Sequence, residues 1–356
     1  MELSNLIAIN TSNKTQELLF LSLEDVVACG GADVTGAAID IQEAFSSFSE
    51  GNVIQPSKTT LKVTGRGHEQ GTGLVNFLPA YVNNGHREIY SCKALGAMPA
   101  NVDQGLPRAT GLITLFDPVT KFPLVVMDAQ SISATRTGAV SLLAARKLVD
   151  PSVEQVGLVG AGINMRTQLL GLAAALPKLK QVRVYSRHQS KFHFAEEMAK
   201  RTQLDIIPVS SAQDAVRGMR MIVTCLPNVG QPVVFDEWVE REGVTIFNIG
   251  CYECEDKILA RMNRVVADIW EQGKHRGIQS HAIAVRNGVI SESKIEDFAP
   301  IVTGQVAGRE SASENIFFCP TGLGFEDAVV ADRVYRNALA KGLGTKLTQW
   351  TSPKWI

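Results

Sequence analysis

The amino-acid sequence predicts an α/β protein in two parts: an α+β part with a mainly antiparallel sheet, followed by a doubly wound parallel sheet. Its 356 residues are too many for one compact core and suffice for two domains of ordinary size. Strand-like runs follow one another at short intervals up to residue 128, which is typical of an antiparallel sheet. After residue 153 such runs alternate with helical segments, which is typical of parallel βαβ units.

In the first part, residues 18–21 form a short apolar run, and Ser22 followed by Asp25 is a capping-type helix start. Apolar residues at helical spacing predict a helix over residues 34–48. Five strands are then predicted, at residues 59–63, 73–78, 88–94, 110–116 and 122–128. Turn-forming residues separate these strands, so we expect one antiparallel sheet with helices packed on a face.

In the second part, short buried strands alternate with helices. The strands are predicted at residues 156–160, 181–185, 205–209, 221–226, 245–249 and 264–268, and the helices at 167–176, 190–201 and 212–217. This alternation predicts a doubly wound sheet of the Rossmann type.

The composition excludes several classes of protein. Thirty-five Lys and Arg residues balance 36 Asp and Glu residues, so bulk charge does not hold this chain on nucleic acid or on an anionic membrane. The longest apolar stretch, residues 169–176, falls far short of the roughly 20 residues that cross a bilayer. The first residues show no basic segment leading into an apolar one, so we expect a cytoplasmic protein. The six cysteines are interpreted as thiols and no histidine pair has metal-ligand spacing, so no metal site is predicted.

A Gly-x-Gly sequence stands where the first strand of the parallel sheet meets its helix. Gly160 allows a tight turn and Gly162 lets the backbone approach a pyrophosphate, with Ala161, Ile163 and Asn164 completing the turn. The third glycine of the dinucleotide fingerprint is absent. We interpret the segment as a dinucleotide-binding turn; an ordinary βα turn is the alternative.

The end of the next strand bears on the choice of nucleotide. NAD sites usually carry a carboxylate there, whereas this chain has Ser186 and Arg187, with Lys191 shortly after. Hydroxyl, guanidinium and ammonium groups suit a 2′-phosphate, so NADP is favoured and NAD stays possible. The alternative is a solvated helix start. Cys225, Leu226 and Gly250 are further predicted cofactor contacts.

A family resemblance rests on longer motifs. Residues 128–145, with Arg136, and the Gly160–Gly162 turn resemble the ornithine cyclodeaminase/mu-crystallin family over nearly the whole chain. Residues 55–58, 108–118, 301–309 and 320–327 resemble its branch of N-(2-amino-2-carboxyethyl)-glutamate dehydrogenases, which make 2,3-diaminopropionate for siderophores and antibiotics. The resemblance implies a substrate-binding and dimerisation lobe over residues 1–132, completed by 316–356, and a Rossmann domain over 133–315. It also implies a homodimer with chemistry in the cleft between the lobes.

The resemblance implies a cationic substrate site. Lys58, Lys93 and Arg136 match family positions that hold a substrate carboxylate, and Arg108 is a further candidate because the branch's substrate carries three carboxylates. The alternatives are a surface lysine for Lys58, a solvent-facing strand residue for Lys93, and a structural ion pair for Arg136.

Two acids complete the predicted site. Glu253 is the candidate general acid/base, with an ordinary loop carboxylate as its alternative, and Asp327 matches a family position near the nicotinamide. Cyclodeaminases carry a Glu where this chain has Asn76, and, aligned on the strand, an Asp where it has Tyr252. An amide cannot transfer a proton as a carboxylate does, which counts against cyclisation.

We therefore predict an NAD(P)-dependent oxidoreductase that acts on the C–N bond of a small amino-acid-derived secondary amine, cleaving it through an imine or reducing the imine. The alternatives are an ornithine cyclodeaminase-type ammonia lyase and a crystallin-like NADPH-binding ketimine reductase or binding protein.

Overall fold

The computed structural model describes residues 15–62, 73–187, 189–227 and 230–351, and it contains two eight-stranded sheets. The first sheet has the order β16-β1-β7-β6-β5-β4-β2, with β3 also paired to β4. Its strands are β1 (Thr15–Leu21), β2 (Val53–Ile54), β3 (Thr59–Lys62), β4 (Leu74–Asn83), β5 (Glu88–Ala97), β6 (Ala109–Phe116), β7 (Pro123–Asp128) and β16 (Thr345–Thr351). Apart from the parallel pair β1–β7, these strands pair antiparallel, as predicted.

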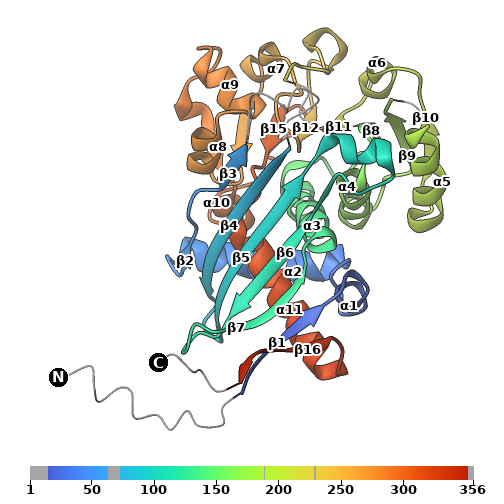
Figure 1. Ribbon diagram of the computed structural model, residues 1–356. Helices are drawn as coiled ribbons and strands as arrows, with labels where there is room; N and C mark the ends of the chain where they lie inside the picture. Colours follow the sequence, from blue (N-terminus) through green and yellow to red (C-terminus); the bar gives the residue numbers. More distant parts are fainter. Residues whose placement is uncertain (1–14, 63–72, 188, 228–229, 352–356) are drawn as a thin grey trace.

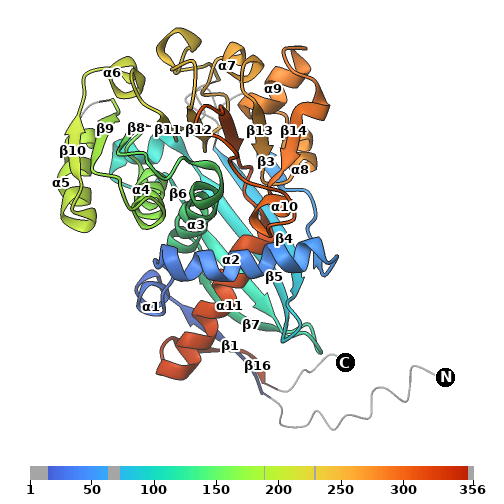
Figure 2. The same ribbon diagram turned by 180° about the vertical axis from the view of Figure 1, so that it is seen from behind.

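Helices cover one face of this sheet (Figures 1 and 2). They are α1 (Leu23–Ala28), α2 (Val34–Ser49), α3 (Gln130–Leu148) and α11 (Gly324–Lys341). Ser22 caps α1 through the predicted capping box with Asp25. The apolar face of α2 meets α11 where Phe45 contacts the ring of Phe325 edge-on, with 5.2 Å between ring centroids. The opposite face of the sheet, turned to the viewer in Figure 1, carries no helix among the described residues.

The second sheet is parallel throughout and has the order β10-β9-β8-β11-β12-β15-β13-β14. Its strands are β8 (Gln155–Val159), β9 (Gln181–Tyr185), β10 (Asp205–Pro208), β11 (Met221–Thr224), β12 (Thr245–Asn248), β13 (Arg264–Ala267), β14 (Ile295–Asp297) and β15 (Ile316–Cys319). The predicted α/β class, a Rossmann-type sheet beside an α+β lobe, is confirmed.

The remaining helices belong to this second lobe. They are α4 (Ile163–Ala175), α5 (Ser190–Thr202), α6 (Ala212–Val216), α7 (Asp256–Ala260), α8 (Trp270–Arg276), α9 (Ser280–Arg286) and α10 (Phe298–Val302), with the short 3-10 turns η3 (Asp236–Trp238) and η4 (Glu292–Lys294). A third 3-10 turn, η2 (Pro99–Gln104), lies in the first lobe between β5 and β6. No helix in the described ranges is long and apolar enough to span a membrane.

The chain returns to the first lobe later than the expected boundary at residue 316. Residues Ile316–Cys319 form β15, which is inserted between β12 and β13 in the second sheet. All four side chains are buried, as a strand covered on both faces requires. The crossing therefore comes after Cys319, where residues 320–323 lead into α11.

One long helix packs between the lobes, and a second covers the first sheet after the chain returns to it. α3 packs against α2 of the first lobe and α4 of the second, and α11 packs against α2, β4 and β5. One continuous apolar core extends across α2, α3 and α4 and the strands beneath them. The lobes therefore meet in a packed interface, and the carboxyl ends of the parallel strands lie next to the first sheet (Figure 1).

Candidate active site

The Gly-x-Gly turn has the geometry that a nucleotide requires. Gly160 follows β8 with φ 120°, and a Cβ there would clash with the carbonyl oxygen of Cys225. Gly162 is the N-cap of α4, and no protein atom lies within 4 Å of the position that its Cβ would take. No side chain caps this helix end, so its first N–H groups stay available to a phosphate. These residues fit a dinucleotide.

The end of β9 places the three residues predicted to read the nucleotide's ribose at one edge of this turn. Ser186 is buried and lies 2.7 Å from the hydroxyl of Ser190, whereas Arg187 is exposed. Lys191 differs from expectation, because its ammonium donates to the carbonyl oxygen of Val209 at 2.7 Å. Of these two cations, therefore, only Arg187 has a side chain without a partner in the described residues.

Glu253 links the loops that follow β11 and β12. Its buried carboxylate accepts hydrogen bonds from the backbone N–H of Leu226 at 2.6 Å and from the side chain of Asn248 at 2.8 Å. It also fills the space above Gly250, where a Cβ would clash with it. Burial raises the pKa of Glu253 to about 7, although its hydrogen bonds act in the opposite direction. Glu253 thus holds Leu226 and Gly250, two predicted cofactor contacts, together at one edge of the sheet.

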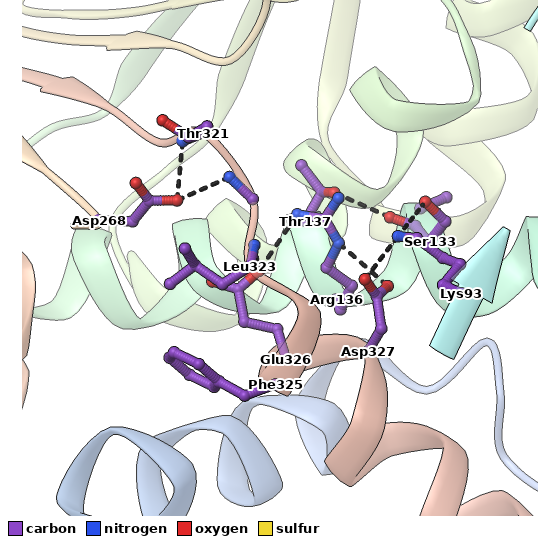
Figure 3. Close-up of polar contacts among 12 residues, drawn as sticks. Lys93, Ser133, Arg136, Thr137, Asp268, Thr321, Leu323, Phe325, Glu326 and Asp327 are labelled. Atoms are coloured by element: carbon purple, nitrogen blue, oxygen red, sulfur yellow. Dashed lines mark hydrogen bonds and ion pairs between the residues drawn. The ribbon is translucent and has the colours of Figure 1, made fainter. Parts of the chain in front are cut away.

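Lys93 and Asp327 form a buried ion pair between the first sheet and α11 (Figure 3). The Nζ atom of Lys93, on β5, lies 2.5 Å from a carboxylate oxygen of Asp327, in the first turn of α11, and both side chains are 1% exposed. Lys93 also donates to the hydroxyl of Ser133 at 3.3 Å. Burial lowers the pKa of Lys93 to about 8, and the charge of Asp327 limits that shift. The ammonium can therefore exchange a proton near neutral pH.

Arg136 extends this pair into a network. Its guanidinium lies 3.2 Å from Glu326 and 3.4 Å from Asp327. A Cβ at Gly322, where φ is 83°, would clash with the same guanidinium, so glycine is required there. Glu326 also accepts the N–H of Leu323 and so caps α11. Burial raises the pKa of Glu326 to about 8, and the charge of Arg136 opposes the shift.

The loop between β15 and α11 closes the site. Asp268, buried at the end of β13, accepts the N–H groups of Thr321 and Gly322 at 2.7 and 2.6 Å (Figure 3). From the first lobe, the ammonium of Lys58 donates to the carbonyl oxygen of Thr321 at 2.8 Å. Burial and the charges of Arg276, Arg136 and Lys93 lower the pKa of Lys58 well below its ordinary value. Lys58 is therefore part of the same cationic cluster.

Arg108 lies where the first lobe faces the second. It is exposed at the start of β6, and its charge acts to lower the pKa of Cys225 and Cys251, against the stronger effect of burial. Both cysteines follow strands of the parallel sheet, so Arg108 is near the predicted cofactor edge.

The structure thus brings Lys58, Lys93, Arg136 and Asp327 into one cluster and gathers the predicted cofactor residues along the neighbouring sheet edge. Sequence reasoning missed Asp268 and Arg276. Asp268 ends a predicted buried strand, which was a usable signal, whereas Arg276 gave none, since basic residues are common in the last turn of a helix. Among the residues described, no group of three acidic, His or Cys side chains is arranged to hold a metal.

Comparison with known proteins extends this picture. The model of the ornithine cyclodeaminase/mu-crystallin family matches residues 22–342. N-((2S)-2-amino-2-carboxyethyl)-L-glutamate dehydrogenase of Staphylococcus aureus is 26% identical over 335 residues, which is 93% of this chain and 98% of that protein.

Two solved structures are similar over the full fold. Δ1-pyrroline-2-carboxylate reductase of Thermococcus litoralis, in complex with NADH and L-proline, superposes with a TM-score of 0.85 at 29% identity, covering 92% of this chain and 99% of that one. An archaeal alanine dehydrogenase dimer with bound NAD has a TM-score of 0.83 at 30% identity, with 94% and 100% coverage. The family model spans nearly all of the described residues, and these relatives cover both lobes. The chain belongs to the ornithine cyclodeaminase/mu-crystallin family.

Proposed function

We propose that this protein is an NAD(P)-dependent oxidoreductase that acts on the CH–NH bond of an amino-acid-derived secondary amine, or on the corresponding imine. The observation that carries the proposal is the buried Lys93–Asp327 pair beside Arg136, next to a turn built for a dinucleotide. Relatives that are an amino acid dehydrogenase and an imine reductase, both with a bound nicotinamide nucleotide, support it.

When bound, the nicotinamide nucleotide supplies the acceptor or donor of hydride. Arg136 binds the carboxylate next to the reacting carbon, and so orients the hydrogen on that carbon toward the nucleotide. Lys93 accepts the proton of the substrate nitrogen as the C–N single bond becomes an imine. Water then adds to the imine carbon and the C–N bond breaks, releasing a keto acid and an amine. In the reverse direction Lys93 returns the proton.

The finer substrate assignment follows the resemblance to the branch that makes 2,3-diaminopropionate. A substrate with three carboxylates would release 2-oxoglutarate and 2,3-diaminopropionate, for siderophore or antibiotic biosynthesis. The similarity to the Staphylococcus aureus enzyme supports this, and so does the number of cations. Arg136 and Lys93 suffice for one carboxylate, so Lys58 and Arg108 are available for further carboxylates. Glu253 stays the candidate acid/base on the cofactor side, since its pKa of about 7 allows proton exchange there.

We propose that NADP is preferred over NAD. The exposed guanidinium of Arg187 at the end of β9 supports this, because it can pair with a 2′-phosphate. Lys191 is occupied by Val209, so the preference depends on Arg187. Arg187→Asp should lower kcat/KM with NADP and not with NAD, and Lys191→Met serves as the matched charge control. An unchanged ratio in Arg187→Asp removes the argument for NADP.

We also propose a homodimer that covers the open face of the first sheet. This face holds a shallow groove of about 500 Å³ whose lining includes Pro79, Tyr81, Tyr90 and Phe116. Leu112, 46% exposed, is on β6, the same strand as Phe116. An alanine dehydrogenase of the same fold is a dimer. Sedimentation equilibrium should give twice the chain mass, and Leu112→Glu should shift it toward the monomer. Wild-type protein that sediments as a monomer contradicts this assignment.

One assay tests the central proposal. Purified protein is incubated with oxidised nucleotide and N-(2-amino-2-carboxyethyl)-glutamate, while the absorbance of reduced nucleotide and the release of ammonia are followed. We expect reduced nucleotide to accumulate with one keto acid for each turnover. Release of ammonia without accumulation indicates cyclodeamination, and tight nucleotide binding without turnover on any amine or imine indicates a binding protein. Either result overturns the proposal.

A further inference from the structure

Two cations of the site form no ion pair among the described residues, although the charge of the buried Asp268 carboxylate acts on one of them, Lys58. Lys93 and Arg136 are each paired with carboxylates of α11. Lys58 donates only to a carbonyl oxygen, and the guanidinium of Arg276 has neither an ion pair nor a hydrogen bond within the ranges that the structure describes. Their positive charges repel each other, and Arg276 is the charge that acts most strongly on Lys58. Such a pair is stabilised when an anion lies between its members.

The position of α8 turns Arg276 toward this cluster. A Cβ added at Gly273, one helical turn before Arg276, would lie 2.6 Å from the imidazole of His281 and 3.5 Å from the hydroxyl of Thr321, so this side of α8 faces α9 and the loop that accepts Lys58. The preceding residue, Gln272, donates to the carbonyl oxygen of Gln55 in the segment that leads to Lys58. Figures 1 and 2 both show α8 beside β3, the strand that follows Lys58.

The nucleotide's phosphates do not reach this position. The phosphate-binding turn follows β8, whereas α8 follows β13, and β11, β12 and β15 lie between them. Strands spaced about 4.8 Å apart place the two strand ends about 19 Å from each other. A dinucleotide anchored at Gly162 extends over the intervening strands, which leaves the β13 side for the substrate.

We infer that Arg276, together with Lys58, binds a second carboxylate of the substrate, distant from the reacting carbon, so that the substrate is an amino or imino dicarboxylate rather than a simple amino acid. The inference rests on the proposed function and makes Arg276 the residue that distinguishes substrates with one carboxylate from those with more. Its guanidinium suits a carboxylate, which it can bind through two parallel hydrogen bonds. Arg276 is half-buried, so such a pair is partly shielded from solvent.

The test compares a dicarboxylate with a monocarboxylate in the same protein. Binding of 2-oxoglutarate and of pyruvate to the complex with oxidised nucleotide is measured by titration calorimetry in wild type, Arg276→Gln and Arg276→Lys. We expect Arg276→Gln to weaken the binding of 2-oxoglutarate about 10- to 100-fold, which corresponds to the loss of one hydrogen bond to a charged group. The binding of pyruvate should change little. Arg276→Lys should recover part of the loss. Reductive amination of the same keto acids with ammonium and reduced nucleotide gives a second readout, the KM for each keto acid.

Lys274→Gln is the matched control, because it removes a positive charge from the same helix end where the side chain pairs with Glu292 at the surface. Lys274→Gln should leave the affinity for both keto acids unchanged. Equal weakening of both keto acids in Arg276→Gln, or of neither, overturns the inference. Wild-type protein that binds the keto acids but turns over no amine or imine overturns the proposed function. The effect of Arg276→Gln on keto-acid binding can still be measured in that case. The two failures are therefore distinguishable.

Discussion

The ammonium of Lys93 lies 2.5 Å from the carboxylate of Asp327, although one residue is on a strand of the first sheet and the other on the last long helix of the chain. Neither charge reaches solvent, so each depends on the other. The pair joins α11 to β5 at the point where we propose that the proton of the reaction is exchanged. In that proposal, stability and catalysis depend on the same contact.

Removing one member of this pair should destabilise the protein strongly. Asp327→Asn leaves the buried charge of Lys93 without its ion-pair partner, which typically lowers the free energy of unfolding by about 3–5 kcal/mol, whereas Lys93→Met should cost less because Asp327 keeps Arg136 at 3.4 Å. The double variant should lose less than the sum of the two, because it leaves neither charge unpaired. Denaturant unfolding of all four proteins measures this coupling. Strict additivity would mean that the two groups do not interact in solution.

The rate of amine oxidation should rise with pH through about 8. Lys93 has a pKa of about 8 and must be neutral to accept a proton, so its active form increases above that value. Arginine stays protonated, and Lys93→Arg should lose this rising limb and about 100-fold or more in kcat. Asp327→Asn should shift the limb to lower pH, because the carboxylate raises the pKa of Lys93. Lys200→Arg, a surface control, should keep the wild-type profile.

The two glycines of the nucleotide turn should respond differently to alanine. Gly162→Ala places its methyl group in open space, so the melting temperature should stay the same while nucleotide affinity falls about 10-fold, equivalent to one lost contact to a charged phosphate. Gly160→Ala should lower both, since its Cβ clashes with the carbonyl of Cys225. Thermal unfolding and nucleotide titration of both variants check this. Unchanged affinity in Gly162→Ala would remove α4 as the phosphate site.

Glu253 should make the protein less stable as pH rises toward neutral. Its pKa is about 7 in the folded chain against an ordinary 4.5, so the folded state binds more protons between these values. Stability is therefore full below about pH 4.5 and declines through about pH 7, by roughly 3 kcal/mol from this group. Glu253→Gln should flatten that slope, whereas the exposed Glu154→Gln should not. Identical slopes in wild type and Glu253→Gln would contradict the raised pKa.

The fold was largely predictable because its signals are local. The capping box of Ser22, the helical spacing of α2 and the short buried strands of the parallel sheet can each be recognised from neighbouring residues. The position of β15 could not be predicted, because a buried run of four residues does not indicate which strands lie on either side of it. That order is set by packing between distant segments.

The sequence indicated which residues form the site, but it did not indicate which of them contact one another. Lys93 and Asp327 were both identified by their match to positions of the family. The contact between them depends on how α11 crosses the sheet. Arg276 has no local pattern that separates it from a solvated residue at a helix end, so only its place beside Lys58 reveals it. The orientation of Lys191 toward Val209 likewise depends on tertiary structure.

The pairing of β1 with β16 has a consequence for how the protein is made. On the ribosome, residues 15–21 emerge long before residues 345–351, so β1 can pair with β7 on one side well before β16 is made on the other. The nucleotide-binding sheet is assembled from residues 155–319 and can condense while translation continues. Premature termination upstream of α11 therefore yields a chain with a nearly complete nucleotide-binding half and an unfinished substrate half.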